Sequence, residues 1–219
     1  MLFLDSSDPA EVRDLFAWGT LSGVTTNPLI LSREAGDSEI EPTIRAVCAA
    51  SKGHVSVELL AESEAEMLEE GLRYHAWEPS RICVKVPLAS EAAMRVLAAL
   101  AARGVPTNAT CLMSFGQAYL AALAGATYVS IFSGRVRDMG YDARPVIAEV
   151  REGLDREGLA SKIIVGSIRQ AFDVTESLAA GGHIVTVPPP ILRKMLWNPQ
   201  TERTLREFNE AWKRRGERE

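Results

Sequence analysis

Residues 82–109 read ICVKVPLASEAAMRVLAALAARGVPTNA and contain the pattern that decides the fold. Ile82–Val86 is an almost continuous apolar run, which is typical of a strand covered on both faces. A second short run follows at Pro106–Ala109, and Gly104 lies where the intervening helix should stop. The order strand, helix, strand predicts two parallel strands joined by a right-handed crossover.

The same alternation extends outward to both ends of the chain. The six further strand candidates are Leu2–Asp5, Gly23–Thr25, Val55–Glu58, Tyr128–Phe132, Lys162–Gly166 and Ile184–Val187. Eight strand–helix units close most simply into a (β/α)8 barrel, an α/β TIM barrel, and 219 residues is at the small end of that fold. A doubly wound open sheet is the alternative. It usually has a glycine-rich phosphate loop after the first strand, and DSSDPAE contains no glycine.

Helix signals lie between these strands. Asp8 is an expected N-cap, with Pro9 at the first helical position and Glu11 as a capping-box acid. Apolar residues recur at helical spacing over residues 146–154. No linker or low-complexity segment divides the chain, so residues 1–219 are expected to form a single domain.

Two additional helices are expected after the last strand, over residues 191–197 and 201–214. The second has a narrow apolar stripe of Leu205, Phe208 and Trp212 on an otherwise polar helix. Either this stripe packs across its own barrel, or it contacts another subunit.

Composition and charge narrow the class of protein. The formal net charge of −5 argues against a general nucleic-acid binder, which needs a basic face. The uncharged run 104–134 is interrupted by proline, glycine and polar residues, so no membrane helix is expected there. The N-terminus lacks the basic segment of a signal peptide. The three cysteines form no CxxC pair and the three histidines have no partner at metal-ligand spacing, so we expect a cytoplasmic protein without a metal.

Polar residues lie at the carboxyl ends of most of the expected strands. They are Asp5, Thr25, Asn27, Glu58, Lys85, Asn108, Thr110, Ser130 and Ser167. Any one of them alone could be an ordinary hydrogen-bonded buried group. Together they predict a functional site, because active sites of TIM barrels are built at this end of the strands.

Lys85 is the most informative of these residues. It lies within a strand that should be buried, and a buried ammonium tends to lose its proton and become a nucleophilic amine. Such amines form Schiff bases with carbonyl compounds. Asp5 and Glu58 could divide the proton transfers that this chemistry requires. Alternatively, Lys85 reaches the rim and is solvated, or pairs with one of the two carboxylates.

A phosphate site is expected late in the barrel. Arg135 follows the sixth strand, and Gly166–Arg169 follows the seventh. TIM barrels often bind phosphate near strands seven and eight, and arginine adds a charge-assisted contact. Arg137 and Arg144 are nearby and are expected to be solvated.

The chain resembles the transaldolase family over nearly its whole length, and specifically the short members beside fructose-6-phosphate aldolase. The matching segments are LFLDSSDPAEV, GVTTNPLIL, SVELLAES, ICVKVPLASEA, GVPTNATCLMSFGQA, AGATYVSIFSGRV, IIVGSIRQ, VTVPPPILRKM and FNEAW. The most specific feature is VTTNP combined with the lysine of VKVP.

This resemblance implies a role for each matching residue. Lys85 would form the imine with C2 of a ketose phosphate, and Asp5 would take the C4 hydroxyl proton. Glu58 and Thr110 would hold the water that carries protons. The dihydroxyacetone fragment would be held by Thr25, Asn27, Asn108 and Ser130, and the phosphates by Arg135, Ser167 and Arg169. No cofactor is implied.

The resemblance also bears on which family activity to expect. The resemblance also places Phe132 in the substrate site, beside the imine. Aldolase-type members carry glutamine at the position of Glu58 and tyrosine at that of Phe132, and they lack Asn108. All three positions favour a transaldolase of the pentose phosphate pathway. This enzyme moves dihydroxyacetone from sedoheptulose 7-phosphate or fructose 6-phosphate to glyceraldehyde 3-phosphate or erythrose 4-phosphate. The alternatives are an aldolase that releases free dihydroxyacetone and a non-catalytic sugar-phosphate-binding barrel.

Two positions depart from the family pattern. Arg137 stands where transaldolases commonly have an acid, and Arg169 is not followed by the usual Asn/His-Pro. Both lie near the expected phosphate site, which leaves the preference for the acceptor sugar open. The resemblance further implies a homo-oligomer, a pentamer or decamer, held partly by the terminal helices.

Overall fold

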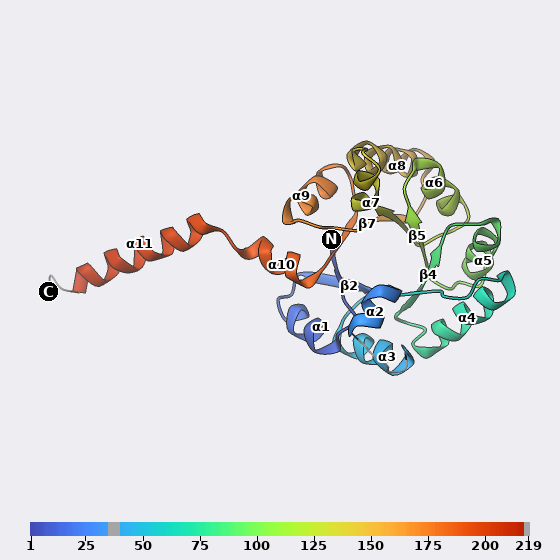
Figure 1. Ribbon diagram of the computed structural model, residues 1–219, viewed down its shortest axis with the longest axis horizontal. Coiled ribbons are helices and arrows are strands. Elements are labelled where there is room, and N and C mark those ends of the chain that lie inside the picture. The colour runs from blue at the N-terminus through green and yellow to red at the C-terminus, as the bar shows by residue number, and fades with distance from the viewer. Residues whose placement is uncertain (35–39, 217–219) are drawn as a thin grey trace.

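The computed structural model describes residues 1–34 and 40–216 of the chain. Eight parallel strands form a closed barrel in chain order, and β8 pairs with β1 to complete it (Figure 1). The strands are β1 Leu2–Asp5, β2 Leu21–Thr25, β3 Val55–Glu58, β4 Ile82–Pro87, β5 Thr107–Leu112, β6 Tyr128–Phe132, β7 Lys162–Gly166 and β8 Ile184–Val187. The predicted (β/α)8 TIM barrel is confirmed.

Helices surround the barrel. They are α1 Pro9–Phe16, α2 Pro28–Glu34, α3 Ile40–Ala50, α4 Glu64–Trp77, α5 Glu91–Ala101, α6 Phe115–Leu123, α7 Ser133–Asp138, α8 Ala143–Glu157, α9 Ala171–Ala179, α10 Pro189–Leu196 and α11 Pro199–Gly216. The short helices α2 and α7 follow β2 and β6 closely, at the carboxyl end of the barrel, and were not expected from the sequence. They place backbone and side chains around the mouth of the barrel.

The apolar core has two parts. The larger part lies between the strands and the surrounding helices and includes residues such as Leu4, Val84 and Ile147. The smaller part fills the inside of the barrel near the amino ends of the strands and consists of Phe3, Cys83, Tyr128, Ile164 and Ile184. We call this second group the inner cluster.

Gly23 has to be a glycine because of the inner cluster. A Cβ atom at this position would lie 2.5 Å from Cζ of Phe3, which is too close for any side chain. The aromatic ring therefore occupies the space that a side chain of β2 would otherwise fill. The amino end of the barrel is closed by packing, as is usual for this fold.

Local signals in the sequence agree with the helix ends. The Asp8 carboxylate accepts hydrogen bonds from the amides of Ala10 at 2.9 Å and Glu11 at 3.4 Å, which confirms it as the N-cap of α1. In α8 the expected apolar face is also confirmed, since Ile147, Val150 and Leu154 are buried.

Three strands differ in extent from the prediction, and one of them, β4, differs only by including Pro87 at its end. β2 begins at Leu21 rather than Gly23, and β5 covers Thr107–Leu112 rather than Pro106–Ala109. The pairing of β5 with β6 shifts between Ala109 and Leu112, where three steps on β5 face two on β6. This irregularity is a β-bulge, which inserts one extra residue into a strand and redirects the neighbouring side chains.

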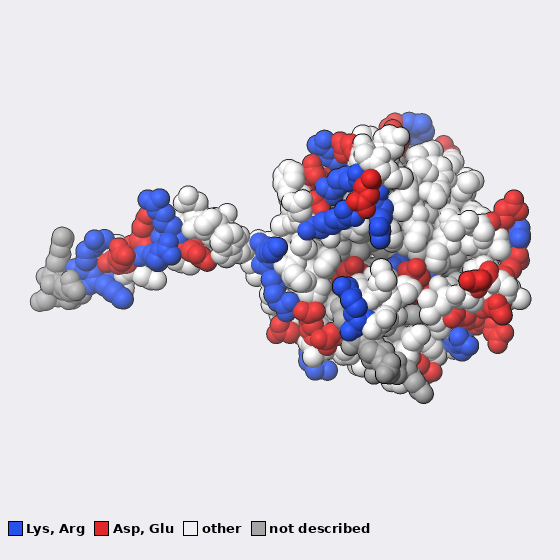
Figure 2. Space-filling view, viewed as in Figure 1, with Lys and Arg blue, Asp and Glu red and all other residues white. Residues whose placement is uncertain are grey.

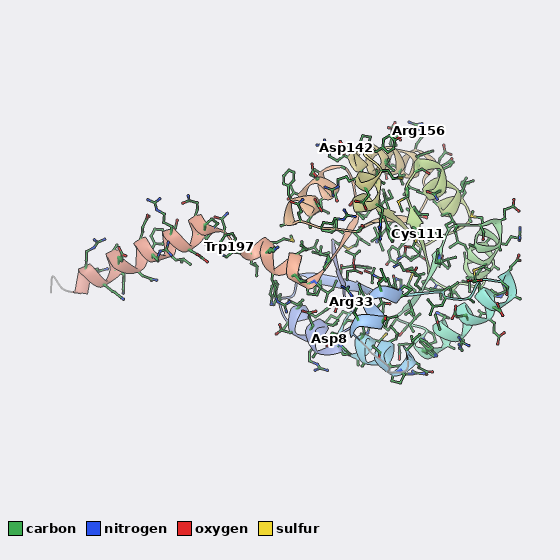
Figure 3. The ribbon with its side chains drawn as sticks, in the orientation of Figure 1. Asp8, Arg33, Cys111, Asp142, Arg156 and Trp197 are labelled. Atoms are coloured by element: carbon green, nitrogen blue, oxygen red, sulfur yellow. The ribbon has the colours of Figure 1, made fainter. Side chains whose placement is uncertain are left out.

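The C-terminal segment leaves the barrel. Helix α10 lies beside it, the chain is extended at Trp197, and α11 projects away (Figures 1 and 3). Leu205, Phe208 and Trp212 are 55%, 66% and 69% exposed. The alternative that this stripe packs across its own barrel is therefore wrong, because the extended backbone at the α10–α11 junction directs α11 outward.

Candidate active site

A pocket of about 360 Å³ opens at the carboxyl ends of the strands. The surface is hollowed at the centre of this end, and basic side chains gather beside the hollow (Figure 2). The lining residues are Asp5, Thr25, Asn27, Pro28, Leu29, Glu58, Lys85, Cys111, Ser130, Phe132, Arg135, Gly166, Ser167 and Thr186. Nine of the twelve residues expected from the sequence are among them, and Asn108, Thr110 and Arg169 are not.

Lys85 lies on β4 and is 4% exposed. Its Nζ atom is 2.8 Å from Oε2 of Glu58 on β3 and donates a hydrogen bond to the backbone oxygen of Thr26 at 3.0 Å. The register pairs Glu58 with Lys85, so the two side chains leave adjacent strands at the same level. The pairing that the sequence left open is thus present, and Glu58 is placed to accept a proton from the Lys85 ammonium.

Phe132 covers one side of this ion pair. The centroid of its ring is 5.9 Å from Lys85 Nζ, within the range of a cation–π contact. The aromatic ring adds an apolar wall to a pocket in which most of the lining residues are of polar type. Such a wall excludes water from the amine.

Asp5, at the end of β1, is part of a chain of hydrogen bonds. Thr25 donates its hydroxyl proton to Oδ1 of Asp5 over 2.8 Å. The hydroxyls of Thr25 and Thr186 are 2.5 Å apart. Both threonines are buried, so these contacts lie at the bottom of the pocket.

Asn108 lies beneath the pocket lining. Its Nδ2 donates to Ser56 Oγ at 3.2 Å, and its Oδ1 accepts from Ser130 Oγ at 2.7 Å. Asn108 is 0% exposed, whereas Ser130 lines the pocket. The amide therefore orients the Ser130 hydroxyl toward a fixed position from below.

Asn27 has two roles at the mouth of the barrel, because it caps helix α2 and lines the pocket. Its Oδ1 accepts a hydrogen bond from the amide of Ile30 at 3.0 Å, which caps the start of α2. The residue also lines the pocket. The helix start thereby fixes the side chain, and its Nδ2 group is the part left to face a ligand.

The bulge in β5 explains the positions of Thr110 and Cys111. Cys111 has a φ of 62°, which is uncommon for a residue with a side chain. Cys111 lines the pocket at the barrel mouth (Figure 3), while Thr110 is buried. The Thr110 hydroxyl has no hydrogen-bond partner among the described residues. Burial and the nearby Glu58 charge raise the pKa of the Cys111 thiol.

Arg135 and Arg169 meet at the expected phosphate end. Arg169 donates two hydrogen bonds to the carboxylate of Asp138, and Arg135 Nη1 lies 3.8 Å from the same carboxylate. The hydrogen bonds from Arg169 lower the pKa of Asp138. Arg135 lines the pocket while Arg169 does not, so Asp138 links an outer arginine to an inner one.

Ser167 and Gly134 are in close contact across the ends of β7 and α7. Ser167 lines the pocket and has a φ of 60°, and a Cβ atom at Gly134 would lie 2.3 Å from its backbone oxygen. Only glycine at 134 permits this approach. The left-handed backbone at Ser167 is held by its surroundings, as is common at functional sites.

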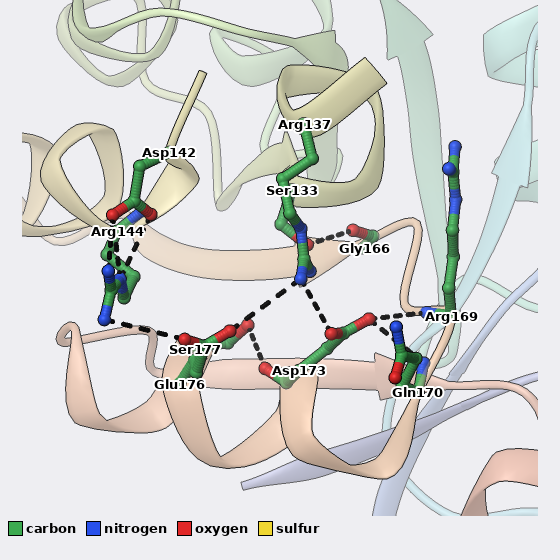
Figure 4. A network of polar contacts seen from close by, with 10 residues as sticks. All are labelled: Ser133, Arg137, Asp142, Arg144, Gly166, Arg169, Gln170, Asp173, Glu176 and Ser177. Carbon is green, nitrogen blue, oxygen red and sulfur yellow. Dashed lines mark hydrogen bonds and ion pairs between the residues drawn. The ribbon is translucent and has the colours of Figure 1, made fainter. Parts of the chain in front are cut away.

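Arg137 belongs to a network of polar contacts that joins α7 to α9 (Figure 4). It pairs with Asp173 at 2.8 Å and lies 3.7 Å from Glu176. The Asp173 carboxylate also accepts hydrogen bonds from the backbone amides of Arg169 and Gln170 at the start of α9. Burial opposes ionisation of Asp173, but these donors outweigh it and lower its pKa. Arg137 is therefore bound rather than solvated, and it does not line the pocket.

Four lining residues were not expected: Pro28, Leu29, Cys111 and Thr186. A fifth, Gly166, begins the segment Gly166–Arg169 that was expected at the phosphate site. Thr186 could have been found, because it is a polar residue near the carboxyl end of the eighth strand, which obeys the rule used for the others. Cys111 could not, since its inward position depends on the bulge.

No group of three His, Cys, Asp or Glu side chains able to hold a metal occurs in residues 1–34 and 40–216. Within the same ranges, no helix has both the length and the apolar character that crossing a membrane requires.

Comparison with known proteins shows which family and which proteins the chain is similar to. The sequence profile of the Transaldolase/Fructose-6-phosphate aldolase family matches residues 2–218. A "Probable transaldolase" of Rhodospirillum centenum is 39% identical, with 98% of this chain and 92% of the relative covered. Proteins of the same name from Thermus thermophilus and Pelotomaculum thermopropionicum are 37% and 36% identical, with 97% of this chain covered in both cases and 98% and 97% of the relatives.

Among solved structures, a mandelate oxidase superposes with a TM-score of 0.61 at 16% identity. The match covers 86% of this chain, which spans 64% of the length of the oxidase chain. At this identity the likeness concerns the barrel fold alone.

Proposed function

Because the chain belongs to the transaldolase/fructose-6-phosphate aldolase family, we propose that it is a transaldolase acting through a Schiff base on Lys85. It moves a dihydroxyacetone unit from sedoheptulose 7-phosphate or fructose 6-phosphate to glyceraldehyde 3-phosphate or erythrose 4-phosphate. The observation that carries the proposal is a buried lysine amine 2.8 Å from the Glu58 carboxylate within a pocket.

Imine formation needs a free amine and a proton carrier. Glu58 takes a proton from the Lys85 ammonium, and the amine attacks the C2 carbonyl of the ketose. Glu58 then returns the proton to the carbinolamine hydroxyl, which leaves as water. The buried Thr110 hydroxyl, which has no partner among the described residues, supports a role in holding a water near this point.

Cleavage requires a base at the C4 hydroxyl. Asp5 takes this proton, the C3–C4 bond breaks, and its electron pair moves into the iminium to give an enamine. The aldose phosphate leaves. An acceptor aldehyde is then attacked by the enamine carbon, Asp5 returns its proton to the new hydroxyl, and water releases the product from Lys85.

Polar groups around the pocket hold the substrate. The dihydroxyacetone fragment is bound by Thr25, Asn27 and Ser130, with Asn108 fixing Ser130 from below. Arg135 and Ser167 contact the phosphate, and Arg169 contributes through the Asp138 carboxylate that lies beside Arg135.

Phe132 favours transfer over release. An aldolase protonates the enamine and releases dihydroxyacetone, which requires a proton donor beside the imine. The ring that faces Lys85 has no hydroxyl group. With fructose 6-phosphate alone we expect little free dihydroxyacetone, and with erythrose 4-phosphate added we expect sedoheptulose 7-phosphate. Steady release of dihydroxyacetone without an acceptor would instead identify an aldolase.

Borohydride trapping tests the Schiff base. Incubation with fructose 6-phosphate and borohydride should leave a reduced adduct on the peptide containing Lys85, and Lys85→Met should leave none. Lys162→Met, which changes an exposed lysine at the amino end of β7, is the matched control and should keep the adduct. An adduct elsewhere, or an active enzyme without one, contradicts the proposal.

We also propose that α11 joins subunits of a homo-oligomer, a pentamer or decamer. The support is the exposed stripe of Leu205, Phe208 and Trp212 on a helix that projects from the barrel. Light scattering should report a multiple of the chain mass. The double change Phe208→Glu and Trp212→Glu should reduce that mass, whereas Glu210→Gln should not. A monomeric unaltered protein would rule this assembly out.

A further inference from the structure

We propose that Thr186 is a positioning residue for the cleavage step, because it fixes the Thr25 hydroxyl that donates to Asp5. The inference rests on the proposed function, in which Asp5 takes the C4 hydroxyl proton. Thr186 does not itself accept that proton; it acts through Thr25.

Thr186 completes a set of four polar residues on the even-numbered strands. The set is Thr25 on β2, Lys85 on β4, Ser130 on β6 and Thr186 on β8, and all four are buried and line the pocket. In a TIM barrel, side chains from alternate strands form a layer inside the barrel. Thr25 and Thr186 therefore meet across β1, the strand between them that carries Asp5.

The direction of the hydrogen bonds follows from counting protons. Thr25 has one hydroxyl proton, and it is donated to Oδ1 of Asp5 at 2.8 Å. The 2.5 Å contact with Thr186 must then use the Thr186 proton, with Thr25 Oγ1 as acceptor. The chain runs from Thr186 through Thr25 to Asp5, and each bond polarises the next.

The rotamer of Thr186 is fixed by its methyl group. A Cβ atom built at Gly166 would lie 3.5 Å from Thr186 Cγ2, so the methyl faces the neighbouring strand β7. Threonine has restricted rotation about χ1 because it is branched at Cβ. With the methyl toward Gly166, the hydroxyl points to Thr25, which explains why a threonine suits this position better than a serine.

Loss of the Thr186 hydroxyl should affect one step of the reaction. Without that donor, the Thr25 hydroxyl can turn away, and Asp5 Oδ1 loses the hydrogen bond that Thr25 donates to it. Imine formation depends on Lys85 and Glu58, which do not contact Thr186 in any hydrogen bond or ion pair of the described residues. The variant should therefore form the imine and cleave it slowly.

The test compares Thr186→Val, Thr186→Ser and Thr107→Val. Thr107 is the matched control, because it is a buried barrel threonine whose hydroxyl has no partner among the described residues and does not line the pocket. Turnover is measured with fructose 6-phosphate and erythrose 4-phosphate. Borohydride-trapped enzyme is analysed by mass spectrometry, which separates the six-carbon adduct, before cleavage, from the three-carbon adduct, after cleavage.

Thr186→Val should lower kcat about tenfold, the effect of losing one positioned hydrogen bond. Its trapped enzyme should shift from the three-carbon to the six-carbon adduct. Thr186→Ser should recover most of the turnover, and Thr107→Val should match the unaltered enzyme in kcat and adduct.

Three results would overturn the inference. They are an unchanged kcat in Thr186→Val, a loss of both adducts in parallel with kcat, or a serine variant no better than the valine variant. Failure of the proposed function looks different, since the unaltered enzyme would then neither trap fructose 6-phosphate nor transfer it.

Discussion

The two ends of the barrel interior differ although the same strands build both. Near the amino ends the interior holds the apolar inner cluster, and near the carboxyl ends it holds the polar pocket. Each member of the inner cluster is followed two residues later by a pocket residue. The pairs are Phe3 and Asp5, Cys83 and Lys85, Tyr128 and Ser130, Ile164 and Gly166, and Ile184 and Thr186.

Residues i and i+2 of a strand point to the same side. Each of these five strands therefore places one residue in the inner cluster and the next residue on the same face in the pocket. The inner cluster supplies rigidity, and the pocket accepts polar groups that would be costly elsewhere in the interior. The predictions below test this division by changing one side at a time.

Lys85→Met should have the largest effect. It replaces the proposed nucleophile by an apolar side chain of similar length, so turnover should fall on the order of a thousandfold or more. The fold should persist but lose about 3 kcal/mol of stability, because the Glu58 carboxylate, 12% exposed, loses its ion-pair partner. Activity and thermal unfolding are measured together. A variant that unfolds, or one that keeps substantial turnover, would contradict the separation of the two ends.

Ile164→Ala tests the opposite end. Ile164 is 0% exposed in the inner cluster, and removing its side chain should lower the free energy of unfolding by about 3 kcal/mol. Denaturant titration measures this change. The kcat of the remaining folded enzyme should stay close to that of the unaltered protein, and a loss of kcat as large as the loss of stability would show that the two regions are coupled.

Asp173→Asn probes a buried carboxylate outside both regions. Donors from Arg169, Arg137 and Gln170 overcome the effect of burial and hold the pKa of Asp173 below its ordinary value of 3.8. The ionised group therefore stabilises the fold above that pH, and the contribution is lost as the pH falls through the lower folded pKa.

At pH 6 the asparagine variant should be less stable by about 2 kcal/mol. The difference in free energy of unfolding between the variant and the unaltered protein should become smaller as the pH falls below the ordinary pKa of the carboxyl. Urea unfolding at several pH values measures it. If this difference in free energy of unfolding grows at lower pH, the Asp173 carboxyl is neutral in the folded protein.

Arg135→Gln should have the smallest effect of these four substitutions, and it should affect only the binding of the sugar phosphate. It removes a charge at the pocket wall, so KM for the sugar phosphate should rise about tenfold with kcat little changed. Arg137→Gln is the matched control two residues away, where the side chain faces Asp173 instead. Equal KM values for the two variants would show that the phosphate binds elsewhere.

Most of the barrel could be predicted, because covered parallel strands require apolar runs and helices require a repeating apolar face. Lys85, Asp5 and Glu58 could be found for a related reason, since a charged residue at the end of an apolar strand is unusual. Thr186 was not expected, although it is a polar residue near the carboxyl end of β8, as Thr25 is at the end of β2.

Other features depend on contacts distant in sequence. The bulge that turns Cys111 inward is set by the pairing of β5 with β6, and no local signal in TNATCL indicates it. The pairing of Arg137 with Asp173 joins two helices, α7 and α9, that are separate in sequence. The outward direction of α11 depends on the extended backbone at Trp197.

Packing of Phe3 against Gly23 bears on the order of steps in the proposed reaction. The inner cluster, which includes this ring, packs the interior of the described barrel near its amino end. Under the proposed function, donor, acceptor and both products therefore use the pocket at the carboxyl end. In the proposed reaction the first aldose phosphate leaves before the second binds, while the dihydroxyacetone fragment stays attached to Lys85. Initial rates at varied donor and acceptor should therefore give parallel double-reciprocal lines, the kinetic mark of a substituted-enzyme sequence.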